Sequence, residues 1–328
     1  MSRPLRVLLA GYAGAGVQDH QAQMYAPAFA AHPGFSIAGI AGAEKAGDDG
    51  RERARAAAVA LGVPYVDNLD DALRRIDADV VSVCVPLDAR VEAVTAALRA
   101  GRHVLVDKPM ALSLAECAEI AAVAAETGLL CVPAHHQRFH PAIRSASTAV
   151  AAGRVGLPWN VQADFLVAGG HPFPLGELAN FGVYPVDVIL AMTGLPVLEV
   201  YAADSGDGPA VLCMRRERGL TSTITVGRVQ EIPDEPMAVH RYRLSGSHGV
   251  LFVDATRPQL TVRSAQGPQA VSFTRGTVDA LVDEVYAAIS AGRPAAPGAH
   301  DAVAVAAVLD AANESVRTGA PVTLEAIA

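Results

Sequence analysis

The sequence has no run of lysines and arginines, no CxxC pair and no long apolar window without charges. The net charge of -8 argues against non-specific binding to nucleic acid or to an anionic membrane, because both require a basic face. A membrane-spanning helix needs about 18 uncharged apolar residues in succession, and no window supplies them. The apolar stretch near the start breaks at glycines and precedes no cleavage box, so we expect no secretory signal.

Cysteine is scarce, with four residues in the whole chain: Cys84, Cys117, Cys131 and Cys213. Three of them lie in apolar runs, and Cys117 lies in a predicted helix. We interpret all four as reduced core residues of a cytoplasmic protein.

The chain nevertheless has ample material for a core, with 328 residues of which 51% are hydrophobic and 18% charged. That length is enough for two ordinary domains, and the composition is typical of a globular chain. We place the division at residue 136, because the pattern of the sequence changes there.

Residues 1–136 alternate apolar strands with helical segments. The strands "LRVLLAG", "FSIAGIAG", "ADVVSVCVP", "HVLVDK" and "GLLCVPAH" are continuous apolar runs, as expected for strands buried on both faces. Asp88 is a predicted N-cap, and Ser113 with Glu116 forms the capping-box pattern S-x-x-E before a second helix that stops at Gly128. This rhythm predicts an α/β Rossmann domain with a doubly wound parallel sheet.

Residues 137–328 have a different pattern, with one helix, then a series of strands, then two helices. Several strands, such as "TSTITVGRV" and "HRYRLSG", alternate polar and apolar residues. That alternation is typical of an antiparallel sheet with one covered face. We therefore predict an α+β domain with an open, mostly antiparallel sheet and its helices on one side.

A glycine-rich turn follows the first predicted strand, with Gly11, Gly14 and Gly16 in the spacing G-x-x-G-x-G. Glycines at this place let the backbone approach a pyrophosphate, which the next helix N-terminus attracts, although they also suit any tight strand-to-helix turn. The acidic residue that would hold the adenosine ribose is displaced, with Glu44 followed by Lys45. Glu44 would suit a ribose and Lys45 a 2′-phosphate, so the pattern leaves NAD and NADP both open.

The stretch "GRHVLVDKPMALSLAE" ends a buried strand on Lys108 and Pro109. Lysine is costly to bury and proline cannot continue a ladder, so this pair indicates a site rather than a packing element. Ligands bind at the C-terminal ends of strands in such sheets. A lysine there can stabilise negative charge on the oxygen of a reacting carbon.

Four stretches in order resemble the glucose–fructose oxidoreductase / inositol dehydrogenase family, often called Gfo/Idh/MocA. They are "ALRAGRHVLVDKPMALSLAEC", "QRFHPAIRSASTAVAAGRVG", "GELANFGVYPVD" and "SVRTGAPVTL", which together run over nearly the whole chain. The resemblance implies a Rossmann domain followed by a domain with an open sheet. It also implies hydride transfer between a nicotinamide and a sugar, cyclitol or related carbon, in a homodimer or homotetramer assembled through the second-domain sheet.

The resemblance also implies roles for individual residues. Lys108 would polarise the substrate oxygen. Tyr184, at the family's usual histidine position, would be the acid/base, with its pKa, ordinarily about 10, lowered by the lysine cation. The positions implied to bind the cofactor are Gly11, Tyr12, Ala13, Gly14, Gly16, Pro86, Lys108 and Pro109. The positions implied to bind substrate are Arg138, His171, Asn180 and Tyr184.

The sequence departs from the family pattern at several positions. Asn180 replaces the usual aspartate, so it can orient a substrate but cannot relay a proton. Arg90 stands where a histidine is usual, and we interpret it as a solvated helix arginine. Asp107 replaces the usual glutamate. We interpret Asp187 first as a structural residue and second as an active-site residue.

Other functions stay open at this point. His135, His136 and His140 in "HHQRFH" contain an i, i+4 pair but no H-E-x-x-H arrangement, so we expect no metal. Asn180 leaves room for an imine or conjugated-system reductase of the same fold. A non-catalytic dinucleotide-binding regulator is the third alternative, because fold does not determine function.

Overall fold

The computed structural model divides the chain into two compact units, which we describe separately. Unit 1 comprises Met1–Ala134 and Val278–Val303, and unit 2 comprises His135–Thr277 and Ala304–Ala328. The structure describes residues 3–12, 19–42, 47–170, 173, 176–204, 206, 208–232, 237–256, 260–264, 267–271 and 276–325. Among these residues no helix has the length and apolar character needed to cross a membrane.

Unit 1 contains a six-stranded parallel sheet in the order β3-β2-β1-β4-β5-β6. The strands are β1 (Leu5–Ala10), β2 (Phe35–Ala41), β3 (Tyr65–Val66), β4 (Val80–Val83), β5 (His103–Val106) and β6 (Cys131–Pro133). The apolar runs form these strands because both faces of a parallel sheet are covered by helices. The strand order reverses between β1 and β4, which is where ligands bind in doubly wound folds. The predicted Rossmann sheet is confirmed.

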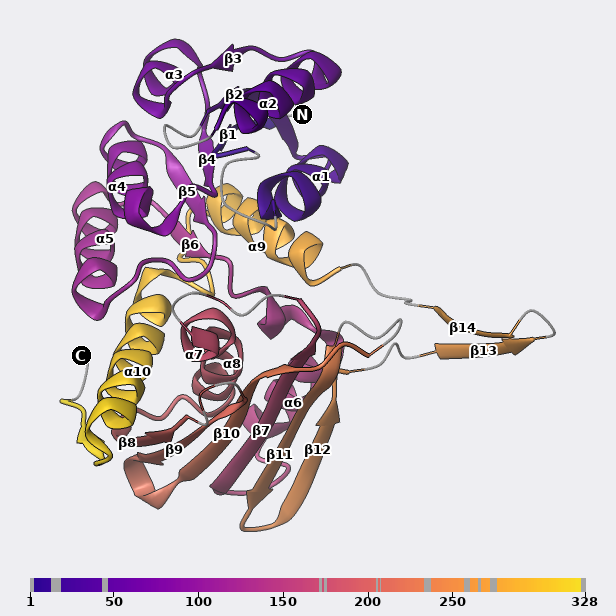
Figure 1. Cartoon of the computed structure of the whole chain (residues 1–328), viewed down its shortest axis with the longest axis vertical. Coiled ribbons are helices and arrows are strands. Elements are labelled where there is room, and N and C mark those ends of the chain that lie inside the picture. The colour runs from indigo at the N-terminus through magenta and orange to yellow at the C-terminus, as the bar shows by residue number, and fades with distance from the viewer. Residues whose placement is uncertain are drawn as a thin grey trace. The chain divides into compact units, whose positions relative to one another are not determined.

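The helices of unit 1 connect these strands. They are η1 (Gln21–Tyr25), α1 (Ala26–Ala31), α2 (Asp48–Leu61), α3 (Leu69–Arg75), η2 (Leu87–Ala89), α4 (Arg90–Arg99) and α5 (Leu114–Thr127). Helices α4 and α5 lie side by side on one face of the sheet, and α1 lies on the other (Figure 1). The helices therefore cover both faces of the sheet, as the doubly wound fold requires.

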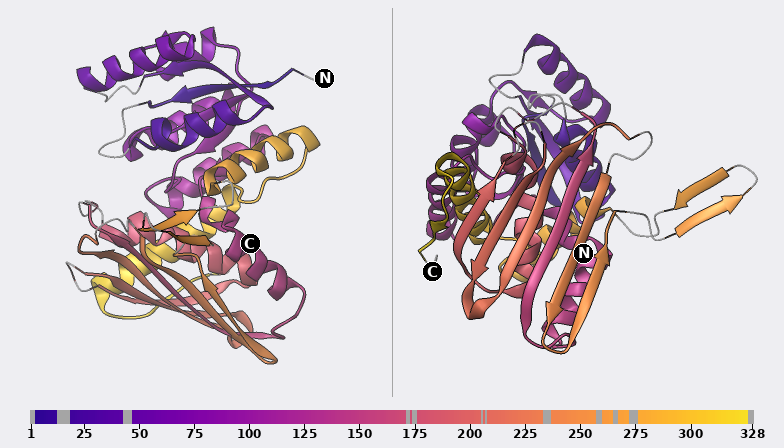
Figure 2. Two further views of the ribbon diagram at one scale, coloured as in Figure 1. Left: turned by 90° about the vertical axis from the view of Figure 1, so that its right-hand side faces the viewer. Right: turned by 60° about the horizontal axis from the view of Figure 1, so that its bottom comes forward.

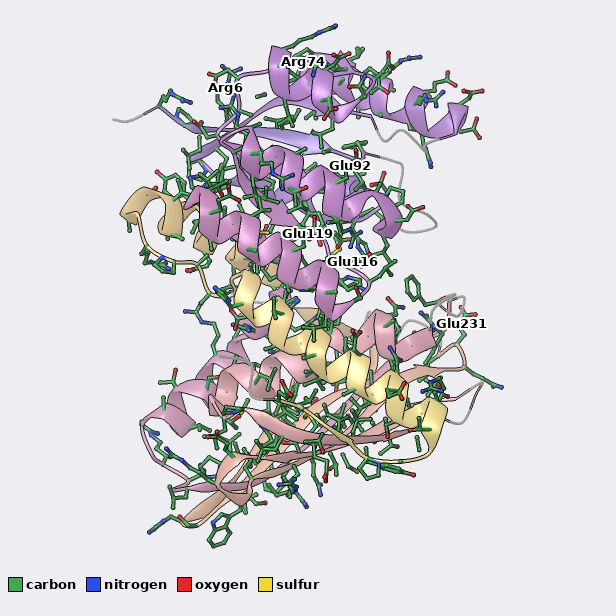
Figure 3. The ribbon with its side chains drawn as sticks, turned by 90° about the vertical axis from the view of Figure 1, so that its left-hand side faces the viewer. Arg6, Arg74, Glu92, Glu116, Glu119 and Glu231 are labelled. Atoms are coloured by element: carbon green, nitrogen blue, oxygen red, sulfur yellow. The ribbon has the colours of Figure 1, made fainter. Side chains whose placement is uncertain are left out.

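The capping predictions have two outcomes. The Ser113–Glu116 capping box at the start of α5 is confirmed, since both reciprocal hydrogen bonds are present, and Gly128 ends this helix in the left-handed conformation. Figure 3 labels Glu116 at this end of α5. The prediction for Asp88 is wrong. A short 3-10 turn precedes α4, so the N-cap position falls on Ala89, and no side chain caps the helix.

Helix α9 (Thr277–Ala291) lies almost entirely in unit 1, although its sequence follows the strands of unit 2. Its Tyr286 ring packs against His32 and Phe35, with centroids 4.9 and 5.6 Å apart. His32 Nε2 also lies 3.3 Å from an Asp283 carboxylate oxygen. The predicted boundary at residue 136 is close to the change of unit after Ala134. It assigns α9 to the second part, whereas these contacts group α9 with the first.

Unit 2 contains a seven-stranded sheet in the order β12-β11-β7-β10-β9-β8-β15. Its strands are β7 (Pro158–Ala168), β8 (Val197–Ala203), β9 (Ala210–Arg216), β10 (Thr221–Val229), β11 (Met237–Gly246), β12 (Gly249–Asp254) and β15 (Val322–Thr323). Only β7 and β10 pair in parallel, so the predicted open, mostly antiparallel sheet is confirmed. Strands β13 (Leu260–Ser264) and β14 (Gly267–Val271) pair with each other in a separate two-stranded sheet.

The remaining elements of unit 2 are η3 (His136–Phe139), η4 (Glu217–Gly219), α6 (Pro141–Ala151), α7 (Gly176–Phe181), α8 (Val183–Thr193) and most of α10 (Ala299–Thr318). Helices α6, α7 and α8 cover one face of the sheet (Figure 1). On that face, alternate residues such as Val161, Phe165 and Leu212 are buried in the core. The other face is turned toward the viewer in the right-hand view of Figure 2, and in the described part of the chain no helix covers it.

The period-two alternation of β9 explains one error in our sequence interpretation. Ala210, Leu212 and Met214 point into the core, so Cys213 between them is exposed on the open face. We had assigned Cys213 to the core from its apolar neighbours, and that assignment is wrong. Cys84, Cys117 and Cys131 are buried as predicted, and all four cysteines are free thiols.

Candidate active site

Gly11 lies at the C-terminal end of β1 and needs to be a glycine for two reasons. Its φ of 85° is in the left-handed region. A Cβ at this position would also lie only 2.4 Å from the Cys84 carbonyl oxygen at the end of β4. Gly11 thus lies at the strand-order reversal, the place where a pyrophosphate approaches the main chain in folds of this kind. Tyr12 follows and is partly buried, whereas Ala13, Gly14 and Gly16 lie outside the described residues, as do Glu44 and Lys45.

Lys108 lies two residues after the end of β5, at the same C-terminal edge of the sheet. It is 8% exposed, and its peptide bond to Pro109 is cis. Pro86 occupies the corresponding place after β4, where it precedes the short η2 turn. The structure thus brings Gly11, Pro86, Lys108 and Pro109 to one edge of the unit 1 sheet, because the C-terminal ends of parallel strands share an edge.

The neighbour of Lys108 is a buried carboxylate, Asp107. Its Oδ1 accepts a hydrogen bond from the Tyr25 hydroxyl at 2.6 Å, and His20 Nδ1 lies 3.1 Å away. Burial raises the pKa of Asp107, but the hydrogen bond from His20 and the charges of Arg90, His20 and Lys108 outweigh burial and hold the pKa well below its usual range. Asp107 is therefore a fixed negative charge next to the lysine.

Arg90 is the residue of unit 1 whose role the sequence analysis missed. We expected a solvated helix arginine, but the side chain is 3% exposed, so that interpretation is wrong. Its guanidinium donates hydrogen bonds to the main-chain oxygens of Val85, Asp107 and Pro109. Since two of these carbonyls flank Lys108, Arg90 ties the lysine's main chain to the end of β4. Only its place at the start of α4 hinted at this in the sequence.

In unit 2 the candidate residues lie where α8 faces η3. Helix α8 is buried almost all round, as its uniformly apolar sequence predicts. Tyr184 and Asp187 are three residues apart on it and therefore share a face. The Tyr184 hydroxyl lies 3.1 Å from His136 Nε2, and His136 Nδ1 lies 2.7 Å from the Thr277 hydroxyl. Tyr184 is 8% exposed and also stacks near Phe165.

Asp187 holds the other two polar residues of the η3 region. His135 Nδ1 lies 2.6 Å from its Oδ1, and Arg138 donates hydrogen bonds to both carboxylate oxygens. Burial raises the pKa of Asp187, but the charges of His135 and Arg138 and their hydrogen bonds lower it further than burial raises it. The guanidinium of Arg138, which we expected to reach substrate, is thus bound to Asp187. Asp187 ties α8 to η3, as its predicted structural role requires.

Asn180 lies on α7 and is partly exposed. Its amide nitrogen donates to Glu177 Oε2 at 3.2 Å, and Glu177 Oε1 accepts from Arg228 Nε at 3.1 Å. The carboxylate near this position therefore comes from Glu177 rather than from residue 180. His171, the other predicted substrate ligand, lies outside the described residues.

The histidines of "HHQRFH" are engaged by protein groups. His135 contacts Asp187, His136 contacts Tyr184 and Thr277, and the His140 ring accepts from the Ala142 main chain at the start of α6. Among the described residues, no group of three or more His, Cys, Asp or Glu side chains has the geometry of a metal site.

These groups can exchange protons and stabilise developing charge. A lysine cation at a strand end can stabilise a developing oxyanion, and a tyrosine hydroxyl beside a histidine can exchange a proton. With its parallel sheet and the strand-order reversal beside Gly11, unit 1 has the topology of a dinucleotide-binding Rossmann domain.

The comparison with family models agrees. Residues 5–135 match the GFO_IDH_MocA family, described as "Oxidoreductase family, NAD-binding Rossmann fold". These residues are therefore similar to that oxidoreductase family, and the predicted resemblance is confirmed.

Curated relatives extend the match by different amounts. A dTDP-3,4-didehydro-2,6-dideoxy-alpha-D-glucose 3-reductase of Streptomyces violaceoruber is 30% identical over 200 residues, which are 58% of this chain and 55% of the reductase. Three such relatives, this reductase included, are matched over only 41 to 55% of their own length. A D-xylose 1-dehydrogenase (NADP(+)) 2 of Haloferax volcanii is 28% identical over 84% of this chain and 90% of that enzyme.

Solved structures share the whole fold. A scyllo-inositol dehydrogenase from Lactobacillus casei, crystallised with bound NAD(H) and scyllo-inositol, superimposes with a TM-score of 0.80. The superposition covers 98% of this chain and 99% of that one, at 17% identity. At this identity the likeness shows the fold alone, including the open sheet of unit 2.

Proposed function

We propose that this protein is an NAD(P)-dependent oxidoreductase. It would transfer a hydride between a nicotinamide and a C–OH/C=O carbon of a sugar, cyclitol or related small molecule. The observation that carries the proposal is the C-terminal edge of the unit 1 sheet, where Gly11 follows β1 and the buried Lys108 follows β5, the two strands on either side of β4. The relatives whose names specify sugar substrates support the substrate class.

Lys108 would donate a hydrogen bond to the reacting oxygen and stabilise its negative charge. Tyr184 would give a proton to that oxygen in reduction and take it back in oxidation. Asn180, held by Glu177, would orient a substrate hydroxyl. Arg138 would contribute to substrate binding indirectly, through its contact with Asp187. The nicotinamide dinucleotide supplies the hydride when bound, and Gly11, Tyr12, Pro86 and Pro109 would line its place, with Ala13, Gly14 and Gly16 in the same turn.

The first test is a titration of the purified protein with NADH and NADPH separately, followed by nicotinamide fluorescence. We expect tight binding of one, and Gly11→Ala should weaken it at least about tenfold, or about 1.4 kcal/mol, because the added Cβ collides with the Cys84 carbonyl. Gly62→Ala is the matched control. Gly62 also has a positive φ, of 67°, but open space around its Cβ position, so binding should not change.

Binding of neither dinucleotide by the wild type would refute the hydride-transfer proposal. If one binds, turnover is measured next with a panel of sugars, cyclitols and cyclic imines. Turnover of imines alone would favour an imine reductase.

We further propose that the protein works in the cytoplasm as a homodimer or homotetramer, assembled through the open face of the unit 2 sheet. Free thiols at all four cysteines suit a reducing compartment. One row of paired residues crosses this face from β8 to β12: Tyr201, Cys213, Thr223, Gln162, Arg243 and Phe252. Tyr201 is 41% and Phe252 76% exposed, so the row carries large apolar groups at both ends.

Thr223→Arg should break this assembly. A charge at the centre of a face that meets its own copy places like charges together, and desolvating them is costly. Light scattering after gel filtration should show the mass falling from a multiple of 33.9 kDa to the monomer value. Val59→Arg, at an 82% exposed site on α2, should leave the mass unchanged. An oligomer that survives Thr223→Arg would place the interface elsewhere.

A further inference from the structure

Tyr184 has a partner that its own segment of sequence does not contain. His136 Nε2 lies 3.1 Å from the Tyr184 hydroxyl, and the two rings meet edge to face with centroids 5.2 Å apart. Both side chains are buried, at 6% and 8% exposure. The imidazole is therefore held in one position against the phenol.

The second ring nitrogen of His136 is also engaged. Nδ1 lies 2.7 Å from the Thr277 hydroxyl at the first residue of α9. A hydroxyl can either donate or accept a hydrogen bond, so it suits Nδ1 with or without a proton. Thr277 can therefore hold the ring in place while its protonation changes.

The adjacent histidine shows the contrast. His135 Nδ1 meets the Asp187 carboxylate, which only accepts hydrogen bonds. Of the two neighbouring histidines, one is thus held on the carboxylate that ties α8 to η3. The other contacts a phenol on one side and a hydroxyl on the other, which is the arrangement expected of a ring that exchanges protons.

We propose that His136 is the positioning and proton-exchange partner of Tyr184, oriented by Thr277. This inference rests on the proposed function, in which Tyr184 is the acid/base of a hydride transfer. It adds a residue that acts through Tyr184 rather than on the substrate.

In the reducing direction the proton moves in two steps. A bound nicotinamide would supply the hydride to the carbonyl carbon, and the proton for the substrate oxygen would come from Tyr184, whose O–H bond breaks as an O–H bond forms on the substrate. The Nε2–H bond of the His136 imidazolium then breaks as the Tyr184 O–H bond re-forms, and the neutral imidazole that is left takes a proton from solvent. Oxidation runs the same steps backwards, with His136 receiving the proton that Tyr184 takes from the alcohol.

Titratable and charged groups surround His136 on several elements. From α8 come Tyr184 and Asp187, and from the η3 region His135, Arg138 and His140. His240 on β11 also faces this group. Its pKa is lowered to about 3, first by burial and then by the charges of His140 and His136, so it is neutral near pH 7. Of these histidines, His136 is the one whose ring nitrogen lies within hydrogen-bond distance of the Tyr184 hydroxyl.

The test compares pH profiles of kcat for His136→Gln and for the wild type. Glutamine can hydrogen-bond the phenol but cannot titrate. We expect kcat at pH 7 to fall about 100-fold, the low end for general acid–base catalysis, and the limb of the profile that belongs to the histidine to disappear. In His136→Ala, added imidazole should raise kcat at least about tenfold above its value without imidazole. An unchanged profile together with no rescue would overturn the proposal.

The matched control is His140→Asn, four residues along the same segment. Asparagine can still accept the main-chain hydrogen bond at the start of α6, so both kcat and its pH profile should stay as in the wild type. If this variant lost the same limb, the limb would belong to the general fold of the η3 region and not to His136.

A second readout needs neither cofactor nor substrate. In protein labelled with ¹⁵N-histidine, the His136 titration followed by NMR should shift in Tyr184→Phe, which lacks the hydroxyl. An identical titration in both proteins would contradict the coupling. The kinetic results separate the proposed function from the role of His136. Full turnover by Tyr184→Phe would refute Tyr184 as the acid/base. Loss of turnover in Tyr184→Phe with full turnover in His136→Gln refutes only the role of His136.

Discussion

Replacing Lys108 by methionine should lower kcat by about 100- to 1000-fold, the effect typical of removing one preorganised donor to a developing oxyanion. Methionine has a similar length and suits an 8% exposed position, so we expect the fold to persist. The change removes the ammonium group while Asp107 keeps its hydrogen bond from Tyr25. The measurements are steady-state kcat and KM on a substrate from the panel, with thermal unfolding to verify the fold.

Lys108→Arg separates charge from geometry. The guanidinium keeps the positive charge but is larger and planar, so it cannot take the position of the ammonium. We expect most of the loss in kcat to remain in this variant. Full turnover by Lys108→Met would show that the lysine is not part of the chemistry, even if the dinucleotide still binds.

The sequence could predict the unit 1 sheet because its signals are local. Continuous apolar runs mark buried parallel strands, and the Ser113–Glu116 box depends on residues three apart. Asp88 shows the limit of local reasoning. It has the right residue type for an N-cap, but a 3-10 turn inserted after Pro86 moved the cap by one residue. No local rule predicts that insertion.

The site residues that the sequence missed depend on long-range contacts. Arg90 has the sequence context of a surface arginine. Its hydrogen-bond acceptors are main-chain oxygens, and no residue type in the sequence indicates them. His136 was considered only as a metal ligand, from its spacing to His135 and His140. Its partners are 48 and 141 residues away in the chain, so only the fold reveals them.

Lys108 and Tyr184 are alike in this respect. Lys108 was predicted from its place at a strand end and from a family motif, and Tyr184 from a family motif alone, but the immediate partners of neither residue were predicted. Arg138 was expected to contact substrate, and the structure shows its guanidinium on Asp187. A motif therefore located the chemical groups, whereas the structure identified the residues that hold them in place.

Asp187→Asn should produce the largest loss of stability, about 3 kcal/mol of unfolding free energy at pH 7. Breaking a buried ion pair leaves an uncompensated charge, here Arg138, in a site where Asp187 is 1% exposed. The single tryptophan, Trp159 on β7, lies in unit 2 with Asp187, so its fluorescence during urea unfolding reports on the affected unit. The loss should appear as a lower urea midpoint.

Two controls test this loss of stability: its dependence on pH, and a substitution in an exposed ion pair. The folded pKa of Asp187 is lowered, so its stabilisation is present above the unfolded pKa of about 4 and is lost as pH falls through the folded pKa. The difference between wild type and Asp187→Asn should therefore shrink below about pH 4. Asp254 pairs with Arg241 at 3.1 Å on the open sheet face, where both side chains are about half exposed, and Asp254→Asn should cost about 1 kcal/mol or less. Equal losses from the two substitutions would mean that burial of the Asp187 pair does not determine the stability of unit 2.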